Sequence, residues 1–308
     1  MQIEILGSAA GGGFPQWNCN CRNCRGVRAG TVQAKSRTQT QVAVSDNGHA
    51  WFLLNASPDL RMQIERTPAL HPRGVRDSPI SGVLLTGADV DQIAGLLSLR
   101  ELQPFRIYCT PSLRRLLRED NSAFAMLNRI PQQVCWSDIG AGEDFSLCTI
   151  SGEESGIRCE VFPLRDRYPV YVSPRRAAQL KTEEASLGVI LTAASGRRLA
   201  YLPAVPALDD RLRQLLETAD LILFDGTFWS DDELISLQGS GATAREMGHV
   251  PVSGSEGSLR ALAELQRPRK IFVHVNNTNP MLDECGPEYR EVREAGWEIA
   301  EDGWQLHL

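Results

Sequence analysis

The 308-residue sequence has no long apolar run and no cluster of basic residues. No stretch approaches the roughly 20 apolar residues that a membrane helix needs. The net charge is -6 and the pI about 5.5, so nucleic acid and anionic membranes are poor candidate partners. The first residues lack a charged segment followed by an apolar one. We therefore expect no secretory signal, and a cytoplasmic location.

Cysteine, by contrast, is concentrated near the start. Cys19, Cys21 and Cys24 fall within WNCNCRNCRG, residues 17–26. A reducing compartment disfavours disulfides, so a tight cluster favours a metal. Cys21 and Cys24 form a C-x-x-C pair, and Cys19 projects to the same side as Cys21 in an extended segment.

Structural zinc wants four ligands. The sequence therefore predicts a structural Zn2+ in an N-terminal zinc-binding loop at about 17–26. The fourth ligand has to come from a distant segment or from another chain. The alternatives are three unliganded thiols or a redox C-x-x-C pair.

Short apolar, β-branched runs alternate with helical patterns along the chain, which is typical of the α/β class. No Gly/Ser-rich or Pro-rich linker divides it, so we expect a single domain, 1–308. The expected helices are 58–66, 90–102, 111–118, 208–218, 257–266 and 287–295. The expected strands are 2–6, 40–45, 51–54, 80–85, 106–109, 134–136, 158–162, 187–192, 198–202, 221–225, 270–275, 297–300 and 304–307.

A second informative stretch is VLLTGADVDQIAGLLSLRE, residues 83–101. It predicts an apolar strand, a short turn and then a helix that begins near Val90. Loops that follow strands are where α/β proteins place their chemistry. Asp89, Asp91 and Gln92 lie on this turn and are candidate site residues.

This stretch resembles the pattern of the metallo-β-lactamase superfamily, in which a strand leads to H-x-H-x-D-H and then to a helix. Gly87, Asp89, Asp91 and Gln92 occupy the four ligand positions, and only Asp91 matches. The whole chain resembles more closely the coenzyme PQQ synthesis protein B family, a distant branch of that superfamily. The motifs that carry this resemblance are GSAAGGGFPQWNCNCRNC, RTQT, LLNASPDLR, GLLSLRE, LILFDGTFW, REMGHVP and VHVNNTNPML.

The resemblance implies a metallo-β-lactamase-like αββα four-layer sandwich. It also implies that the cysteines bind a structural zinc, which is linked in the family to formation of a homodimer. The family retains Asp-His at the end of the superfamily pattern, whereas this sequence reads Asp91-Gln92. Glutamine offers a carbonyl oxygen, a weaker ligand than imidazole for iron, zinc or copper.

Four residues distant from this turn match other family positions. His274 lies next to the end of the expected strand KIFVHV, where relatives complete the metal site; alternatively, it supplies the fourth ligand to the cysteines. Some relatives bind the zinc with a histidine three residues further on, which here is Asn277. His249, in MGHVP, matches a residue of the same pocket. Asp225 ends LILFD, and Asp59 lies in NASPDLR; either can support the site, and Asp59 is equally well explained as a helix first-turn acid.

The resemblance implies a role in making pyrroloquinoline quinone, a redox cofactor cut from a ribosomal peptide. The implied activity is an iron-dependent oxygenase that hydroxylates the tyrosine ring of a cross-linked Glu–Tyr peptide-derived intermediate. In this hypothesis Asp89, Asp91 and His274 hold an active-site metal, Fe2+. Gln92 assists them, and His249 donates or accepts a proton near the substrate.

Two other functions are compatible with the same residues. One is a carrier or transport-assisting protein for PQQ or its precursor, which a weakened metal site would suit. The other is a metal-dependent hydrolase, the common chemistry of the superfamily, although the absent histidines leave few ligands for a two-metal site. For an amino-acid-like substrate, the candidate partners of its carboxylates are Arg37, Arg61 and Arg100.

Overall fold

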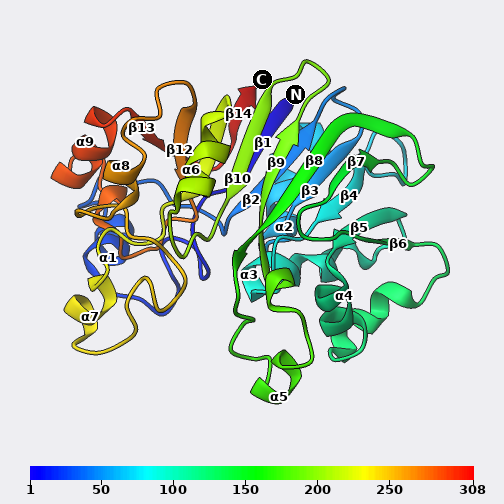
Figure 1. Ribbon diagram of the computed structural model, residues 1–308, viewed down its shortest axis with the longest axis horizontal. Helices are drawn as coiled ribbons and strands as arrows, with labels where there is room; N and C mark the ends of the chain where they lie inside the picture. Colours follow the sequence, from blue (N-terminus) through cyan, green and yellow to red (C-terminus); the bar gives the residue numbers. More distant parts are fainter. The chain divides into compact units, whose positions relative to one another are not determined.

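The computed structural model describes residues 1–164 and 166–308, together with the backbone of residue 165. The chain forms two compact units, each built from separate segments (Figure 1). The first unit comprises 1–6, 41–197 and 303–308, and the second comprises 7–40 and 198–302. A single domain over 1–308 stays a prediction. Among the described residues, no helix combines the length and the hydropathy that crossing a membrane requires.

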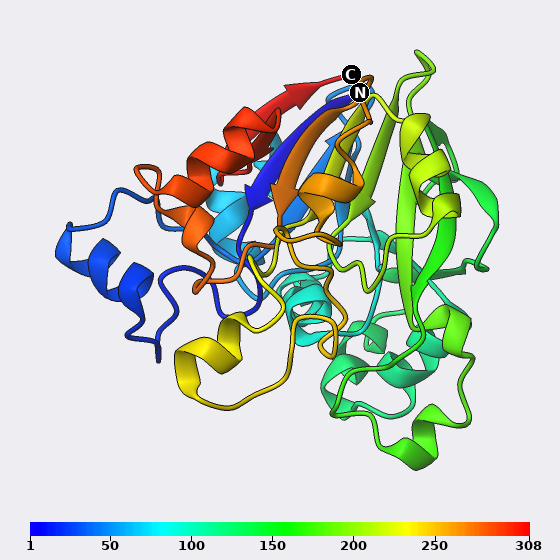
Figure 2. The same ribbon diagram turned by 60° about the vertical axis from the view of Figure 1, so that its left-hand side comes forward.

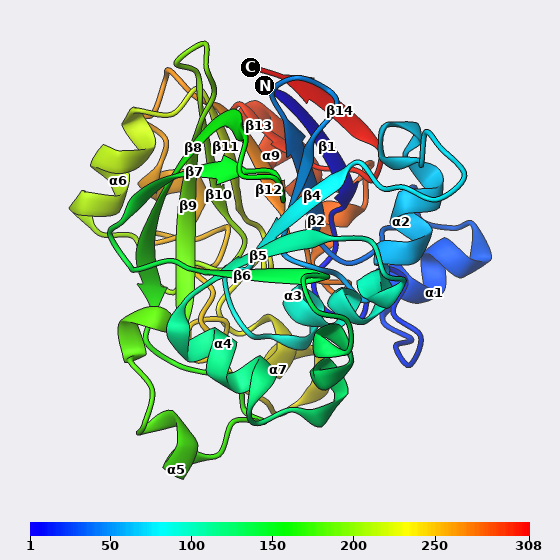
Figure 3. The same ribbon diagram turned by 90° about the vertical axis from the view of Figure 1, so that its right-hand side faces the viewer.

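The first unit contains a seven-stranded sheet in the order β14-β1-β2-β3-β4-β5-β6. Both chain ends belong to it, and the amino group of Met1 donates to the carbonyl of Leu308 at 2.6 Å (Figure 3). The strands β3 to β6 are parallel, while β14 with β1 and β2 with β3 are antiparallel. The strands are β1 Gln2–Gly7, β2 Gln41–Ser45, β3 Trp51–Leu54, β4 Ile80–Leu84, β5 Phe105–Cys109, β6 Val134–Asp138 and β14 Trp304–His307.

Three further antiparallel strands and four helices complete the first unit. The helix α4 begins with Pro111 at its first position, and the hydroxyl of Thr110 caps it by accepting from the Leu113 amide at 3.3 Å. The helix lies beneath β5 and β6 (Figure 3), and its leucines join the hydrophobic core. These elements are β7 Asp144–Cys148, β8 Glu154–Arg165, β9 Ser186–Thr192, α2 Leu60–Arg66, α3 Val90–Ile93, α4 Pro111–Arg118 and α5 Pro174–Ala177.

The second unit is built on four parallel strands, β10 Arg198–Leu202, β11 Leu221–Asp225, β12 Arg269–Val273 and β13 Trp297–Ile299. Because they are parallel, the loops that follow β10, β11 and β12 leave the same edge of the sheet. Figure 2 shows α1 standing away from these strands. The helices are α1 Arg22–Ala29, α6 Asp210–Glu217, α7 Glu233–Gln238, α8 Ser258–Ala261 and α9 Pro287–Glu294.

The expected strands are present, with ends shifted by a few residues, and β7 is an additional one. The helix expected over 90–102 is instead a short α3 followed by a 3-10 helix, Ala94–Arg100. The amide of Gly95 donates to the carbonyl of Ala56 at 2.8 Å rather than to a carbonyl of α3, which ends the α-helical pattern. The helix expected over 257–266 is shorter, because only α8, Ser258–Ala261, is α-helical there. The helices α1, α5 and α7 were not predicted.

Candidate metal centres

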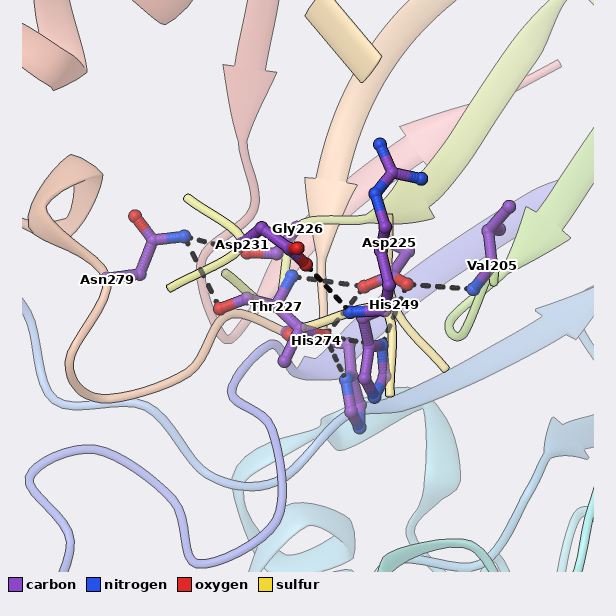
Figure 4. A network of polar contacts seen from close by, with 9 residues as sticks. Val205, Asp225, Gly226, Thr227, Asp231, His249, His274 and Asn279 are labelled. Carbon is purple, nitrogen blue, oxygen red and sulfur yellow. Dashed lines mark hydrogen bonds and ion pairs between the residues drawn. The ribbon is translucent and has the colours of Figure 1, made fainter. Parts of the chain in front are cut away.

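Asp225, the last residue of β11, is completely buried and accepts four hydrogen bonds (Figure 4). Its Oδ2 accepts from the Val205 amide at 2.8 Å and from Nδ1 of His249 at 2.8 Å. Its Oδ1 accepts from the amide of Thr227 at 3.0 Å and from its hydroxyl at 2.6 Å. Burial raises the pKa of this carboxyl, but the electrostatic attraction and hydrogen bond of His249, the attraction of His274 and the hydrogen bond from Thr227 together leave the pKa lowered.

His249 and His274 present their rings side by side (Figure 4). The ring centroids are 5.5 Å apart and the planes differ by only 18°. Each residue is 9% exposed. The loop of His249 is tied to the end of β10, because the Val250 amide donates to the Val205 carbonyl at 2.6 Å. His274 directly follows β12 and adopts a left-handed backbone, with φ of 57°.

The turn after β11 depends on glycine. A Cβ on Gly226 would lie 2.8 Å from Cβ of Phe272 and 3.0 Å from Cε of Met281, so a larger residue would push the turn off β12. The side chain of Asn279 donates to the Gly226 carbonyl at 3.0 Å and holds the turn from the other side. The turn in this position directs Thr227 toward the carboxylate and the two imidazoles (Figure 4).

Asp225, His249 and His274 offer ligand atoms that all lie within 4.8 Å of one another. Imidazole nitrogens suit iron, zinc and copper. A carboxylate offers about four acceptor directions, and all four of Asp225 are used by the hydrogen bonds above. Asp225 therefore fits the carboxylate that orients a metal-binding histidine through its other nitrogen, rather than a ligand itself.

The turn with Asp89, Asp91 and Gln92 belongs to the first unit. Asp89 directly precedes α3, and the other two lie in its first turn. Gln92 is 6% exposed, and within the described part of the chain its Oε1 accepts no hydrogen bond. A buried unpaired acceptor costs about 1–3 kcal/mol, so this oxygen suits a metal or a donor from substrate. A Cβ on Gly87 would lie 2.3 Å from it, so Gln92 fills space next to the first position of the superfamily pattern.

Tyr171 is a residue at this turn that the sequence did not reveal. Its hydroxyl donates to the carbonyl of Ala88 at 2.5 Å. Tyr171 is 49% exposed, but partial burial, helped by the negative charge of Asp89, raises the pKa of Tyr171 to about 12. It lies in an irregular segment between β8 and α5, and no motif singles it out.

The remaining predicted residues take simpler positions. Asp59 directly precedes α2, which agrees with its helix-start explanation. Arg37 is buried, and its guanidinium donates to the carbonyls of Ala300 at 3.1 Å and Lys35 at 2.9 Å, so it serves the backbone. Arg61 and Arg100 are exposed.

The three thiols of the N-terminal segment form the second group. The sulfurs of Cys19, Cys21 and Cys24 lie within 4.8 Å of one another. The expected loop ends at Cys21, whose sulfur caps α1 by accepting from the Cys24 amide at 3.4 Å, so Cys24 lies on the helix. Burial opposes ionisation of Cys19, but hydrogen bonds from Cys21, Cys24 and Asn277 leave its pKa lowered.

Asn277 is the side chain that meets all three sulfurs. Its amide nitrogen lies 3.1 Å from the sulfur of Cys19, 3.7 Å from that of Cys21 and 3.3 Å from that of Cys24. A flip of the side-chain amide interchanges its nitrogen and its oxygen, so Oδ1 of Asn277 can take the place of the nitrogen among the sulfurs. In a tetrahedral zinc site an oxygen ligand lies roughly 3.5 Å from each sulfur. The cysteines and Asn277 therefore fit one zinc ion.

Comparisons with known proteins agree with this fold. A family model described as a β-lactamase superfamily domain matches residues 50–275. A crystal structure of a diphosphatase from the PhnP family, 19% identical, covers 100% of this chain and 97% of that one with a TM-score of 0.66. The chain thus has the metallo-β-lactamase fold, and the expected α/β sandwich is confirmed.

More similar relatives define the family within that class. The chain is 43% identical over 309 residues to coenzyme PQQ synthesis protein B of Methylobacterium sp. (strain 4-46) and 41% identical over 309 residues to that of Pseudomonas entomophila (strain L48), with 100% of each chain covered. The crystal structure of Zn2+-bound PqqB from Methylobacterium extorquens, 40% identical, superimposes with a TM-score of 0.90 over 100% of both chains. The chain belongs to the coenzyme PQQ synthesis protein B family.

Proposed function

We propose that this protein acts in pyrroloquinoline quinone biosynthesis as an iron-dependent oxygenase, hydroxylating the tyrosine ring of a cross-linked Glu–Tyr peptide-derived intermediate. Its relatives are named for synthesis of this cofactor. The observation that carries the proposal is the pair of stacked imidazoles, one of which is held at Nδ1 by the buried carboxylate of Asp225. Such a carboxylate fixes the ring of His249 and leaves its Nε2 for chemistry, next to the imidazole of His274, which suits a metal.

Each residue has a role in the proposal. Iron, when bound, supplies open positions at which oxygen and substrate meet. His274 holds the metal, and the sequence pattern adds Asp89 and Asp91 as ligands. The unpaired Oε1 of Gln92 assists them. His249 donates or accepts a proton near the substrate, because the hydrogen bond to Asp225 fixes its ring and leaves Nε2 for that task.

The reaction balances with an external reductant. One atom of O2 enters the ring as the hydroxyl, the other leaves as water, and a two-electron donor such as ascorbate supplies the electrons. The test reconstitutes the protein with Fe2+ under anaerobic conditions, adds the Glu–Tyr substrate and ascorbate, and then admits oxygen. We expect the substrate to gain the mass of one oxygen atom.

Variants make the test specific. His249→Gln should abolish the product, whereas His307→Gln, an exposed residue of β14, should leave it unchanged. Tight binding of the finished quinone without turnover would instead favour a carrier. Release of a hydrolysed product without oxygen would favour a hydrolase. Either result would contradict the oxygenase.

We also infer that the cysteine group holds a structural zinc and that Asn277 Oδ1 is the fourth ligand. Support comes from the placement of its amide among the three sulfurs. Asn277→His should keep one zinc per chain and Asn277→Leu should lose most of it, as measured by elemental analysis. A homodimer and a cytoplasmic location stay predictions from the sequence.

A further inference from the structure

Thr227 stands at the centre of the histidine group although no motif marks it as functional. Its hydroxyl oxygen lies 2.6 Å from Oδ1 of Asp225, 2.8 Å from Nδ1 of His274 and 3.1 Å from Nδ1 of His249. Thr227 is 3% exposed, so water does not compete for these contacts. A hydroxyl has one proton to donate and two lone pairs that accept, and the direction of each bond can therefore be worked out.

The hydroxyl proton goes to Asp225. The carboxylate can only accept, its distance is the shortest, and a bond to a charged acceptor is the stronger one. The carbonyl oxygen of His274 lies 3.0 Å from the hydroxyl, but it is a neutral and more distant acceptor than the carboxylate, so the proton stays with Asp225. Facing Nδ1 of His274, the oxygen of Thr227 is therefore an acceptor, and that nitrogen carries the hydrogen.

His249 reaches the same state by a direct route, because its Nδ1 donates to Oδ2 of Asp225 at 2.8 Å. Both neutral imidazoles then carry hydrogen on Nδ1 and a lone pair on Nε2. The ring planes differ by only 18°, and both Nδ1 atoms face the hydroxyl of Thr227, so each Nε2 lies on the side of its ring away from that hydroxyl. One buried carboxylate thus fixes the tautomer of two histidines: that of His249 directly, and that of His274 through Thr227.

We propose that Thr227 is a positioning residue: it donates to Asp225 and accepts from Nδ1 of His274, so that His274 presents Nε2 to a divalent metal while His249 keeps Nε2 for proton transfer. This deepens the proposed function and rests on it for the metal. The proton arrangement does not depend on iron, oxygen or substrate, and it can be measured in the metal-free protein.

The experiment reads the tautomers by NMR of histidine-labelled, metal-free protein, at a pH where both imidazoles are neutral. The signals are assigned with the single variants His249→Gln and His274→Gln. We expect Nδ1–H on both residues of the unsubstituted protein. Thr227→Val, which is similar in shape but lacks the hydroxyl, should lose that tautomer at His274 and keep it at His249. Thr227→Ser should restore it.

The second readout is affinity for Mn2+, followed by its EPR signal, because oxygen and nitrogen ligands suit this ion better than the thiolates do. Thr227→Val should weaken binding about 10–100-fold, the usual cost of removing a group that orients a metal ligand, and Thr227→Ser should not. Nε2–H on His274 of the unsubstituted protein would overturn the proposal without any variant. Equal tautomers and affinity in Thr227→Val would also overturn it. If the unsubstituted protein showed both expected tautomers but did not oxygenate the substrate, only the proposed function would be contradicted.

Discussion

The two candidate metal centres of the second unit are built in opposite ways. The three cysteines fall within residues 19–24 and converge through one short segment and the first turn of α1. The histidine group joins residues up to 49 positions apart, Asp225 to His274, and depends on three parallel strands ending at one edge. Yet they share the segment after β12, because His274 serves one group and Asn277 the other. The three neighbouring thiols need only one distant side chain to complete a metal site, whereas the two imidazoles need buried hydrogen-bond partners to orient them.

The largest expected effect comes from breaking the local centre. Cys21→Ser keeps an oxygen that can cap α1 but removes one of the three sulfurs. Bound zinc should fall from about one per chain to near zero, because small zinc sites lose most of their affinity without a ligand. Elemental analysis of the purified protein measures it. The exposed Cys285, changed to serine, is the control, and an equal loss there would contradict the assignment.

A smaller effect should follow from removing the carboxylate that orients the histidine group. Asp225→Asn replaces two acceptor oxygens that take four hydrogen bonds by one oxygen and one donor. We expect the free energy of unfolding to fall by about 3 kcal/mol, as measured by urea denaturation, and Mn2+ affinity to fall with it.

The matched control is Asp220→Asn, just before the other end of β11, where the carboxylate accepts from the Arg198 amide at 2.8 Å. It should cost stability while leaving Mn2+ affinity unchanged. If both variants lost metal equally, the effect on Asp225→Asn would be one of general stability, and the special role of that carboxylate would be wrong.

These differences explain what the sequence could predict. Thiol spacing and the strand LILFD are local patterns, so the cysteine group and β11 were predicted. The helix α1 was not, because its residues, RNCRGVRA, contain a central glycine and few apolar residues. Its start depends on the sulfur of Cys21. Thr227 was missed for a different reason: a threonine after a strand has no distinctive pattern, and its role arises only when β11 and β12 lie side by side.

The turn after β4, in the first unit, offers another test of a contact that arises only in the folded chain: the contact between Gly87 and Gln92. A Cβ on Gly87 would meet Oε1 of Gln92 at 2.3 Å. Because this oxygen is the end of a flexible side chain that can shift, Gly87→Ala should lower the free energy of unfolding by only about 1 kcal/mol. In the background of Gln92→Ala the same change should cost much less, because the clash is absent. Gly74→Ala, whose Cβ meets Asp77 at an ordinary 3.7 Å, is the control. Additive effects would mean that the two residues do not compete for space.

The smallest expected effect concerns the segment that the two metal centres share. Glu233 accepts from the hydroxyl of Thr278, next to Asn277, and from the Trp229 amide at 2.6 Å. Burial raises the pKa of Glu233 from 4.5 to about 7. Between these two pH values the folded protein holds a proton that the unfolded chain has released. Stability should therefore fall as the pH rises through this window.

Glu233→Gln cannot ionise, so its thermal midpoint should change less with pH over the same window, and the exposed Glu246→Gln should behave like the unsubstituted protein. Differential scanning calorimetry measures all three. If zinc content also changed in Glu233→Gln, the shared segment would transmit strain from α7 to the thiols. If only the pH dependence changed, the three sulfurs would hold Asn277 in place without help from Glu233, as expected for a centre whose ligands are mostly local.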